Sequence, residues 1–242
     1  TTGGGTVGAS FLLASFVTDR AFMRSIHDWG FTLPAPGRLL RLGGQLVGLA
    51  VLAATVGIGY LGPETGYRNL AILVVWVGWW GGYVASTYLI GNTWPVLNPF
   101  RTVASLLPSL DRPYPDRLGA WPSVAGLLAL IWIEVVSPLA DDPRLLATTI
   151  VAYTAVTAAG SVVYGTDSWF GRVDPISRVF ALFGQFAPLK RTDGGLSLRL
   201  PGGALTASGA LSGRAETVFV VAVLYVTTFD GFVGTGLWAR LI

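Results

Sequence analysis

The hydrophobic positions of the chain form long runs without charge, and the charged residues are concentrated in the segments between them. A helix needs about 20 apolar residues to cross the hydrocarbon core of a bilayer. Six runs come near that length: residues 3–18, 42–61, 69–92, 118–139, 145–166 and 217–239. The pattern predicts an all-α integral membrane protein, a single transmembrane domain of about six helices over residues 1–242.

Composition excludes an ordinary soluble protein. Of the 242 residues, 52% are hydrophobic and 12% are charged, and the mean hydropathy is +0.60. Soluble domains are about one quarter charged. We therefore expect a multi-pass protein of the cell membrane that has the lipid bilayer as a partner.

Basic residues are distributed unevenly among the connections, which sets the orientation. The connections after the first, third and fifth runs contain Arg20, Arg24, Arg38, Arg41, Arg101, Arg112, Arg117, Arg172, Arg178, Lys190, Arg191, Arg199 and Arg214. The other two connections contain only Arg68 and Arg144. This predicts an N-terminus outside and long basic loops in the cytoplasm. Orientation explains the net charge of +3, so we expect no nucleic-acid partner.

The residues that usually bind metals and redox cofactors are nearly absent. The chain has no cysteine, one histidine (His27) and one methionine (Met23). It therefore cannot by itself form an iron–sulfur cluster, a bis-histidine haem site or a blue-copper site. The only lysine, Lys190, lies in a polar stretch and does not suit a buried Schiff base. We expect no metal and no cofactor, and the motifs of phosphate-binding loops, zinc proteases and nucleophile elbows are missing.

Two segments of the chain repeat one pattern. Trp94 is followed by Asn98-Pro99, and Trp169 by Asp174-Pro175. Asn and Asp are good helix N-caps, and proline suits the first helical turn. The helices that this pattern predicts are residues 99–107 and 175–187. Each is too short to span a bilayer, so we expect both to be interfacial helices along the inner leaflet.

Two interpretations of this repeat stay open. In the first, Trp94 and Trp169 are interface anchors of the kind that forms aromatic belts, and the capped helices only turn the chain. In the second, the two elements line a pseudo-symmetric cytoplasmic vestibule or docking surface.

A polar cluster accompanies the repeat on the predicted cytoplasmic side. It consists of Arg101, Asp167, Arg172, Asp174 and Arg178. These residues either form ion pairs that fix the short helices or provide a polar site for an anionic ligand.

Two acidic residues fall inside predicted spans, where an ionisable group is a functional candidate. Glu134 and Asp230 lie at similar distances from the inner ends of spans that run in the same direction. Together they are candidates for an ion or proton site. Alternatively, Glu134 reaches the outer interface, and Asp230-Gly231 marks a helix break.

Small residues and one alternating segment predict further packing. The pairs Gly44/Gly48 and Gly78/Gly82 have the spacing that permits close helix contact in lipid. Residues 196–200 alternate with period two before Pro201-Gly202-Gly203. That pattern favours a small cytoplasmic β-hairpin.

The chain resembles an uncharacterised family of polytopic prokaryotic membrane proteins, sometimes loosely labelled fenitrothion hydrolases. The resemblance rests on Asn92–Arg101, Asp174-Pro175 and Phe229-Asp230-Gly231, and it extends over most of the chain. The label implies hydrolysis of organophosphate esters, a chemistry that commonly uses a histidine-rich metal site. With a single histidine, the chain lacks that site, and we do not extend the activity to it.

Three functional hypotheses follow. The first is a non-catalytic subunit that packs with other membrane protein subunits, or with copies of itself, in a larger complex. The second is an ion- or proton-coupled transporter or channel. The third is a membrane-embedded hydrolase with a carboxylate-bound metal. We favour a protein that is not an enzyme.

Overall fold

The computed structural model describes residues 30–192, 195–202, 213–233 and 240. The first predicted span, residues 3–18, lies outside them, as do Met23 and His27. The longer helices of the described part are α3 (Arg38–Leu61), α8 (Trp121–Val136), α9 (Pro143–Tyr164) and α12 (Arg214–Val233). The shorter ones are η1 (Gly66–Arg68), α4 (Leu70–Leu73), η2 (Val74–Tyr83), α5 (Val84–Leu89), α6 (Trp94–Leu97), α7 (Pro99–Ser105), η3 (Asp116–Leu118), α10 (Thr166–Arg172) and α11 (Pro175–Phe183).

Three helices of the described chain are long and apolar enough to cross a membrane: Arg38–Leu61, the continuous helix Leu70–Leu89 and Pro143–Tyr164. They correspond to three of the six predicted spans. The helix Leu70–Leu89 consists of α4, η2 and α5, and its middle part η2 is a π-helix. In the fourth predicted span α8 has 16 residues, and α12 occupies the sixth with 20 residues. Six transmembrane helices are therefore not confirmed.

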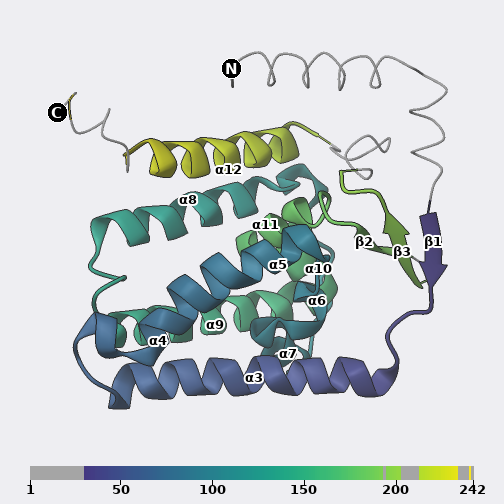
Figure 1. Ribbon diagram of the computed structural model, residues 1–242. Coiled ribbons are helices and arrows are strands. Elements are labelled where there is room, and N and C mark those ends of the chain that lie inside the picture. Colours follow the sequence, from purple (N-terminus) through teal and green to yellow (C-terminus); the bar gives the residue numbers. More distant parts are fainter. Residues whose placement is uncertain (1–29, 193–194, 203–212, 234–239, 241–242) are drawn as a thin grey trace.

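A small antiparallel sheet lies at one end of the bundle, which we call the sheet end (Figure 1). Its strands β1 (Gly30–Leu33), β2 (Leu189–Thr192) and β3 (Gly195–Arg199) are ordered β1-β3-β2. The predicted hairpin exists, but β3 pairs with the strand before it, Leu189 opposite Leu198. The turn therefore precedes β3, and Pro201-Gly202 follows the hairpin instead of closing it.

The two predicted glycine pairs differ in their packing. On α3, a Cβ at Gly44 would lie 2.6 Å from the Val96 side chain, and one at Gly48 would lie 2.1 Å from the Leu97 carbonyl oxygen. This pair lets α6 and α7 approach α3 closely, as predicted. Around Gly78 and Gly82, the described residues bring only backbone oxygens of the same helix within 4 Å, so within that part of the chain the second pair makes no close contact with another helix.

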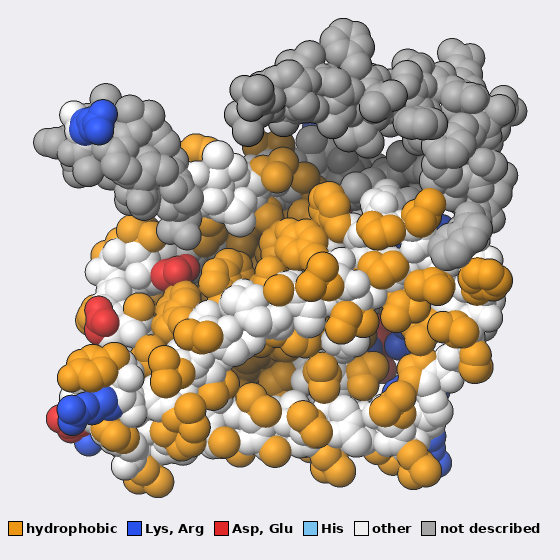
Figure 2. All heavy atoms as spheres, in the orientation of Figure 1, with side chains coloured by type: hydrophobic (Ala, Val, Ile, Leu, Met, Phe, Trp, Pro, Cys, Tyr) orange, Lys and Arg blue, Asp and Glu red, His pale blue; other side chains and the backbone are white. Residues whose placement is uncertain are grey.

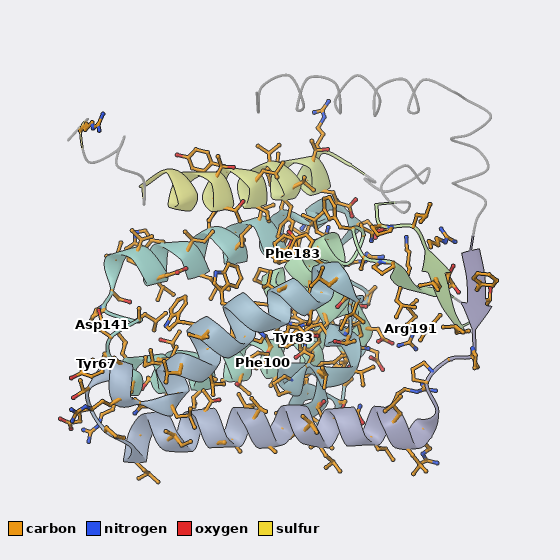
Figure 3. All side chains as sticks on the ribbon, viewed as in Figure 1. Tyr67, Tyr83, Phe100, Asp141, Phe183 and Arg191 are labelled. Carbon is orange, nitrogen blue, oxygen red and sulfur yellow. The ribbon has the colours of Figure 1, made fainter. Side chains whose placement is uncertain are left out.

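Polar and apolar side chains are separated along the bundle axis. Figure 2 shows hydrophobic side chains over most of the described face, with Lys and Arg near its edges. In Figure 3, Tyr67 and Asp141 lie at one end of the bundle and Arg191 lies at the other. Large apolar side chains along the bundle are exposed, for example Leu46 at 66% and Trp132 at 65%. Lipid would cover such a surface, which supports a membrane location.

Candidate functional site

Both copies of the repeat fold into the same local structure, a short helix followed by a capped helix. The first hairpin is α6–α7 and the second hairpin is α10–α11. The Asn98 side chain accepts a hydrogen bond from the Arg101 backbone N–H (3.0 Å), and the Asp174 carboxylate accepts one from the Ser177 N–H (2.7 Å). The predicted caps and both helix starts are therefore confirmed, and proline occupies the first helical position in each.

The second hairpin folds back along α9 toward the middle of the bundle. A Cβ on Gly160 would lie 2.1 Å from the Trp169 ring, near the C-terminal end of α9. Farther along, the Tyr153 hydroxyl donates to the Asp174 carboxylate. Tyr153 lies eleven residues before Tyr164, about 16 Å at 1.5 Å per residue. Asp174 therefore lies beside the middle of α9, which is long enough to cross a membrane.

The first hairpin reaches a similar depth beside α3. Gly48, which contacts the Leu97 carbonyl, lies ten residues after Arg38, about 15 Å along the helix. From there α7 runs back toward the sheet end: Phe100 packs edge-on against Tyr153 (4.9 Å), whereas the later Ser109 bonds to the Ser161 carbonyl.

The two capped helices pack against the long helices of the bundle, and their position along the inner leaflet stays a prediction. The structure adds that α7 and α11, within the predicted residues 99–107 and 175–187, pack inside the bundle. Asn98 and Asp174 are each only 1% exposed, and Phe180 is fully buried. Cap and proline are local signals, whereas entry into the bundle depends on close contacts with α3 and α9 that the local sequence does not specify.

The two hairpins meet at their turns. The Asn98 side-chain amide donates to the Ser177 hydroxyl at 3.2 Å, which joins the cap of one hairpin to the capped helix of the other. Next to this contact the Trp94 and Phe180 rings pack at 4.9 Å. The paired turns are thus held by one polar contact and one aromatic contact.

A cavity of about 380 Å³ lies between the hairpins and α12, and we call it the polar cavity. Its polar lining consists of Asn92, Asn98, Arg101, Asp167, Ser177, Arg178, Gln185 and Glu216. Both copies of the repeat contribute to this lining, as the vestibule interpretation requires.

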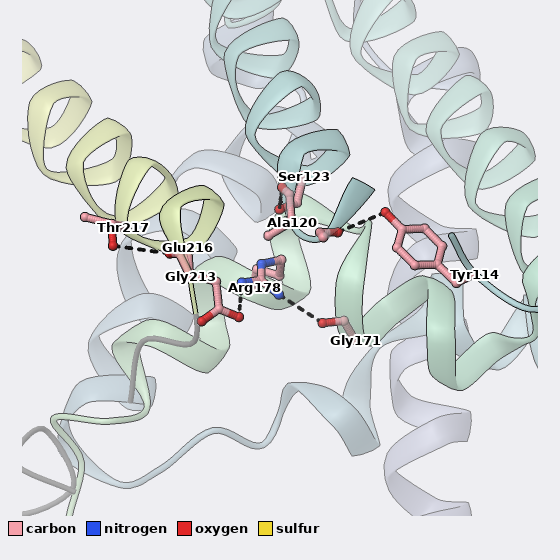
Figure 4. A network of polar contacts seen from close by, with 9 residues as sticks. Tyr114, Ala120, Ser123, Gly171, Arg178, Gly213, Glu216 and Thr217 are labelled. Atoms are coloured by element: carbon pink, nitrogen blue, oxygen red, sulfur yellow. Dashed lines mark hydrogen bonds and ion pairs between the residues drawn. The ribbon is translucent and has the colours of Figure 1, made fainter. Parts of the chain in front are cut away.

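Two ion pairs hold the charged lining of the polar cavity. Arg101 on α7 pairs with Asp167 on α10. Arg178 on α11 pairs with Glu216 on α12 at 3.2 Å, with side chains only 17% and 26% exposed, and also donates to the Gly171 carbonyl (Figure 4). Two positive and two negative groups therefore balance within the cavity, which disfavours a strongly charged ligand.

The rest of the predicted polar cluster lies elsewhere. Arg172 pairs with Asp116 at 3.1 Å and lies over the Tyr114 ring. Burial raises the pKa of the Tyr114 phenol, and the positive charge of Arg172 partly offsets this effect. Asp174 faces Tyr153 and does not line the polar cavity. Of the five residues, three line the polar cavity, Arg172 belongs to a surface ion pair and Asp174 is a buried helix cap.

The tryptophans of the repeat differ in burial, and their role as interface anchors stays a prediction. Trp94 is 5% exposed and packs against Trp79, Tyr83 and Phe180. Trp169 is half-buried against Gly160 of α9. Both residues help to hold the hairpins against the long helices, because their large rings fill the space between them.

The two acidic candidates lie away from the polar cavity. Glu134 is exposed on α8, where it lines a separate, mostly apolar cavity together with Thr227 of α12. Asp230 is part of α12, but its side chain lies outside the described residues. The structure therefore places Glu134 beside α12, and a shared ion or proton site stays a prediction.

Some residues of the site gave no usable signal in the sequence. Tyr153 is one of several hydroxyl-bearing residues in an apolar span, and Glu216 lies 38 residues after its partner Arg178. Within the described residues, no group of three or more His, Cys, Asp and Glu side chains is placed to hold a metal ion.

Comparisons with family models, with curated proteins and with solved structures found no match. The function is therefore argued from the geometry of the site.

Proposed function

We propose that the protein is a membrane transporter or channel that admits a small polar solute into the polar cavity. The observation that carries the proposal is the pair of half-length hairpins whose turns meet at Asn98 and Ser177 beside a cavity lined with charged and amide side chains. Irregular backbone at membrane depth is tolerated where it is buried in protein or lines a cavity. Ligand sites of transporters are built in this way, at interrupted helices near the midplane.

The lining favours an uncharged or zwitterionic solute. The two arginines each have an acidic partner, so the field of the ion pairs is short-ranged. Asn92, Asn98 and Gln185 add carboxamides, which both donate and accept hydrogen bonds. A volume of about 380 Å³ suits a molecule of amino-acid size.

Beyond the hairpin turns the path is closed by aromatic side chains. Trp79, Tyr83, Trp94, Phe100 and Phe180 pack together there. We propose that the polar cavity opens toward the sheet end and that this aromatic barrier must move for release on the other side.

The proposal includes the orientation predicted from charge. Arg38 and Arg41 begin α3 at the sheet end, and Arg191 lies in β2. Glu64 and Asp141 lie toward the opposite end. Because basic residues favour the cytoplasmic side, the sheet end is proposed to face the cytoplasm and the N-terminus the outside. Six spans are retained in this proposal.

The other functional hypotheses have weaker support. A subunit of a larger complex requires an apolar surface that partners cover, and lipid explains the exposed faces of α3 and α8 equally well. The predicted hydrolase requires carboxylates that bind a metal, and within the described part of the chain no three or more His, Cys, Asp and Glu side chains are clustered to hold one. The complex-subunit hypothesis and the hydrolase hypothesis both stay predictions.

Flux through reconstituted protein tests the proposal. In proteoliposomes, light scattering should report faster entry of glycerol, urea or glycine than in protein-free liposomes. Ala181 is exposed on α11 and lines the polar cavity. Ala181→Trp should lower the flux about fivefold or more, because an indole occupies the vestibule. The control is Leu106→Trp, at a residue that is 76% exposed and away from the cavity, and it should leave the flux unchanged. Equal entry into protein-containing and protein-free liposomes for all three probes would contradict the proposal.

A further inference from the structure

A further cavity lies at the sheet end, where α8 and α12 begin (Figure 1). It has a volume of about 520 Å³, and we call it the basic cavity. Arg178 and Glu216 line both this cavity and the polar cavity, so their ion pair lies between the two. Transport through the polar cavity does not require the basic cavity, and the two proposals stand independently. The charged lining of the basic cavity consists of Asp116, Arg117, Arg172, Arg178, Arg214 and Glu216.

The charges of this lining do not cancel. Each of its two acidic side chains pairs with an arginine, at 3.1 Å and 3.2 Å. Arg117 and Arg214 line the same cavity, are exposed, and have no acidic partner within the described part of the chain. The described lining therefore has an excess of two positive charges, which an anionic ligand would balance.

The backbone adds to the positive potential of the basic cavity. Gly119 and Ala120 line it just before α8, and Gly213 lines it just before α12. The N-cap residue of α8, Ala120, provides no side-chain cap. Figure 4 shows the starts of these two helices on either side of Arg178. Because the N-terminal end of a helix carries a partial positive charge, both helix starts favour a phosphate group beside the arginines.

An exposed apolar stripe begins at the edge of the basic cavity. Trp121 lines the cavity and is 48% exposed. Leu128, Trp132 and Val135 follow on the same side of α8 at helical spacing, and each is more than half exposed. Tryptophan is enriched at membrane interfaces, and apolar side chains beyond it face the hydrocarbon. A ligand bound by the arginines can therefore extend an apolar part along α8.

We infer that the basic cavity binds the phosphate headgroup of an anionic phospholipid whose acyl chains lie along α8. Arginine donates paired hydrogen bonds to phosphate oxygens, and Arg117 and Arg214 are available for this contact. A volume of about 520 Å³ accommodates a phosphate with a small polar group such as glycerol. Basic pockets between membrane helices are typical of such sites. A soluble phosphate has the same headgroup chemistry, but it makes no use of the stripe on α8.

Lipid binding to the full chain in a neutral detergent tests this site. Native mass spectrometry should show one dioleoyl phosphatidylglycerol per chain, bound about tenfold more tightly than dioleoyl phosphatidylcholine. Arg117→Gln and Arg214→Gln each remove one positive charge and should weaken binding of phosphatidylglycerol about fivefold. Both side chains are exposed, so the thermal unfolding midpoint should stay within a few degrees. The matched control Arg38→Gln removes an exposed charge at the same end of the bundle but outside the cavity, and it should leave the affinity unchanged.

A competition experiment distinguishes the lipid from a soluble anion. Glycerol 1-phosphate and inorganic phosphate carry the charge without acyl chains, and millimolar concentrations of either should not displace phosphatidylglycerol. Displacement by one of them would assign the cavity to a soluble phosphate and overturn the inference. Equal affinity for the two lipids, unchanged affinity in both cavity variants, or an equally large loss in Arg38→Gln would also overturn it.

Discussion

Replacing Phe180 with alanine is expected to lower the free energy of unfolding by about 3–5 kcal/mol. The side chain is fully buried, and its ring packs against Trp79 at 5.5 Å, Tyr83 at 5.0 Å and Trp94 at 4.9 Å. It thus joins the second hairpin to the first hairpin and to the helix Leu70–Leu89. Removing the ring leaves a void between rigid helices that cannot close around it.

The measurement is equilibrium unfolding in mild detergent, with Phe186→Ala as the matched control. Phe186 is 41% exposed, and its ring lies 5.6 Å from the Tyr88 ring. Its loss should cost less than about 1 kcal/mol. If the two alanine variants unfold alike, Phe180 is not the centre of the core described above.

Substituting Gly48 with alanine is expected to destabilise the protein by about 3 kcal/mol, at the upper end of the range for overpacked sites. The new Cβ would lie 2.1 Å from the Leu97 carbonyl oxygen and 3.0 Å from its carbonyl carbon. Backbone atoms cannot rotate away as a side chain can, so α3 and the first hairpin must separate. Because Asn98 directly follows Leu97 in the chain, its hydrogen bond to Ser177 should weaken as well.

Gly57 on the same helix provides a control of opposite sign. Apart from its own helix backbone, no atom of the described residues lies within 4 Å of a Cβ at that position. Gly57→Ala should therefore be neutral or stabilise the protein by up to about 1 kcal/mol, since alanine favours the helix. Measured in the same detergent, equal effects of the two substitutions would contradict the close approach of the hairpin to α3.

Local signals in the sequence predicted the elements of this fold better than their positions. Charge-free runs identified the helices at 42–61, 69–92 and 145–166, because an apolar segment of that length has few alternatives to a span. The caps at Asn98 and Asp174 fixed where the short helices begin. Strand β1 was missed: its four residues, all exposed, carry no alternating pattern and are defined by pairing with β3.

The site was only partly predictable for a similar reason. Composition identified Arg101, Asp167 and Arg178, but their division into pairs depends on where each long side chain reaches. Glu216 joins Arg178 because α12 packs near the second hairpin. Burial of Trp94 requires Tyr83 and Phe180 on other elements. Such contacts form between distant parts of the chain, and one sequence does not encode them locally.

The two hairpins enter the bundle and meet beside the polar cavity, which is proposed to open toward the sheet end. The chain contains no cysteine, so single thiols can be placed at will. Ser177→Cys lies where the hairpins meet, Arg191→Cys lies on β2 at the sheet end, and Val151→Cys is a 46% exposed residue of α9 near the depth of Tyr153.

The deciding measurement is the rate at which a small charged thiol reagent modifies these cysteines from each side of sealed membrane vesicles. We expect Ser177→Cys to react only from the side that modifies Arg191→Cys, while Val151→Cys, facing lipid, stays unmodified. If Ser177→Cys reacts no faster than Val151→Cys, or reacts from the opposite side, the hairpins do not line an aqueous cavity at the sheet end.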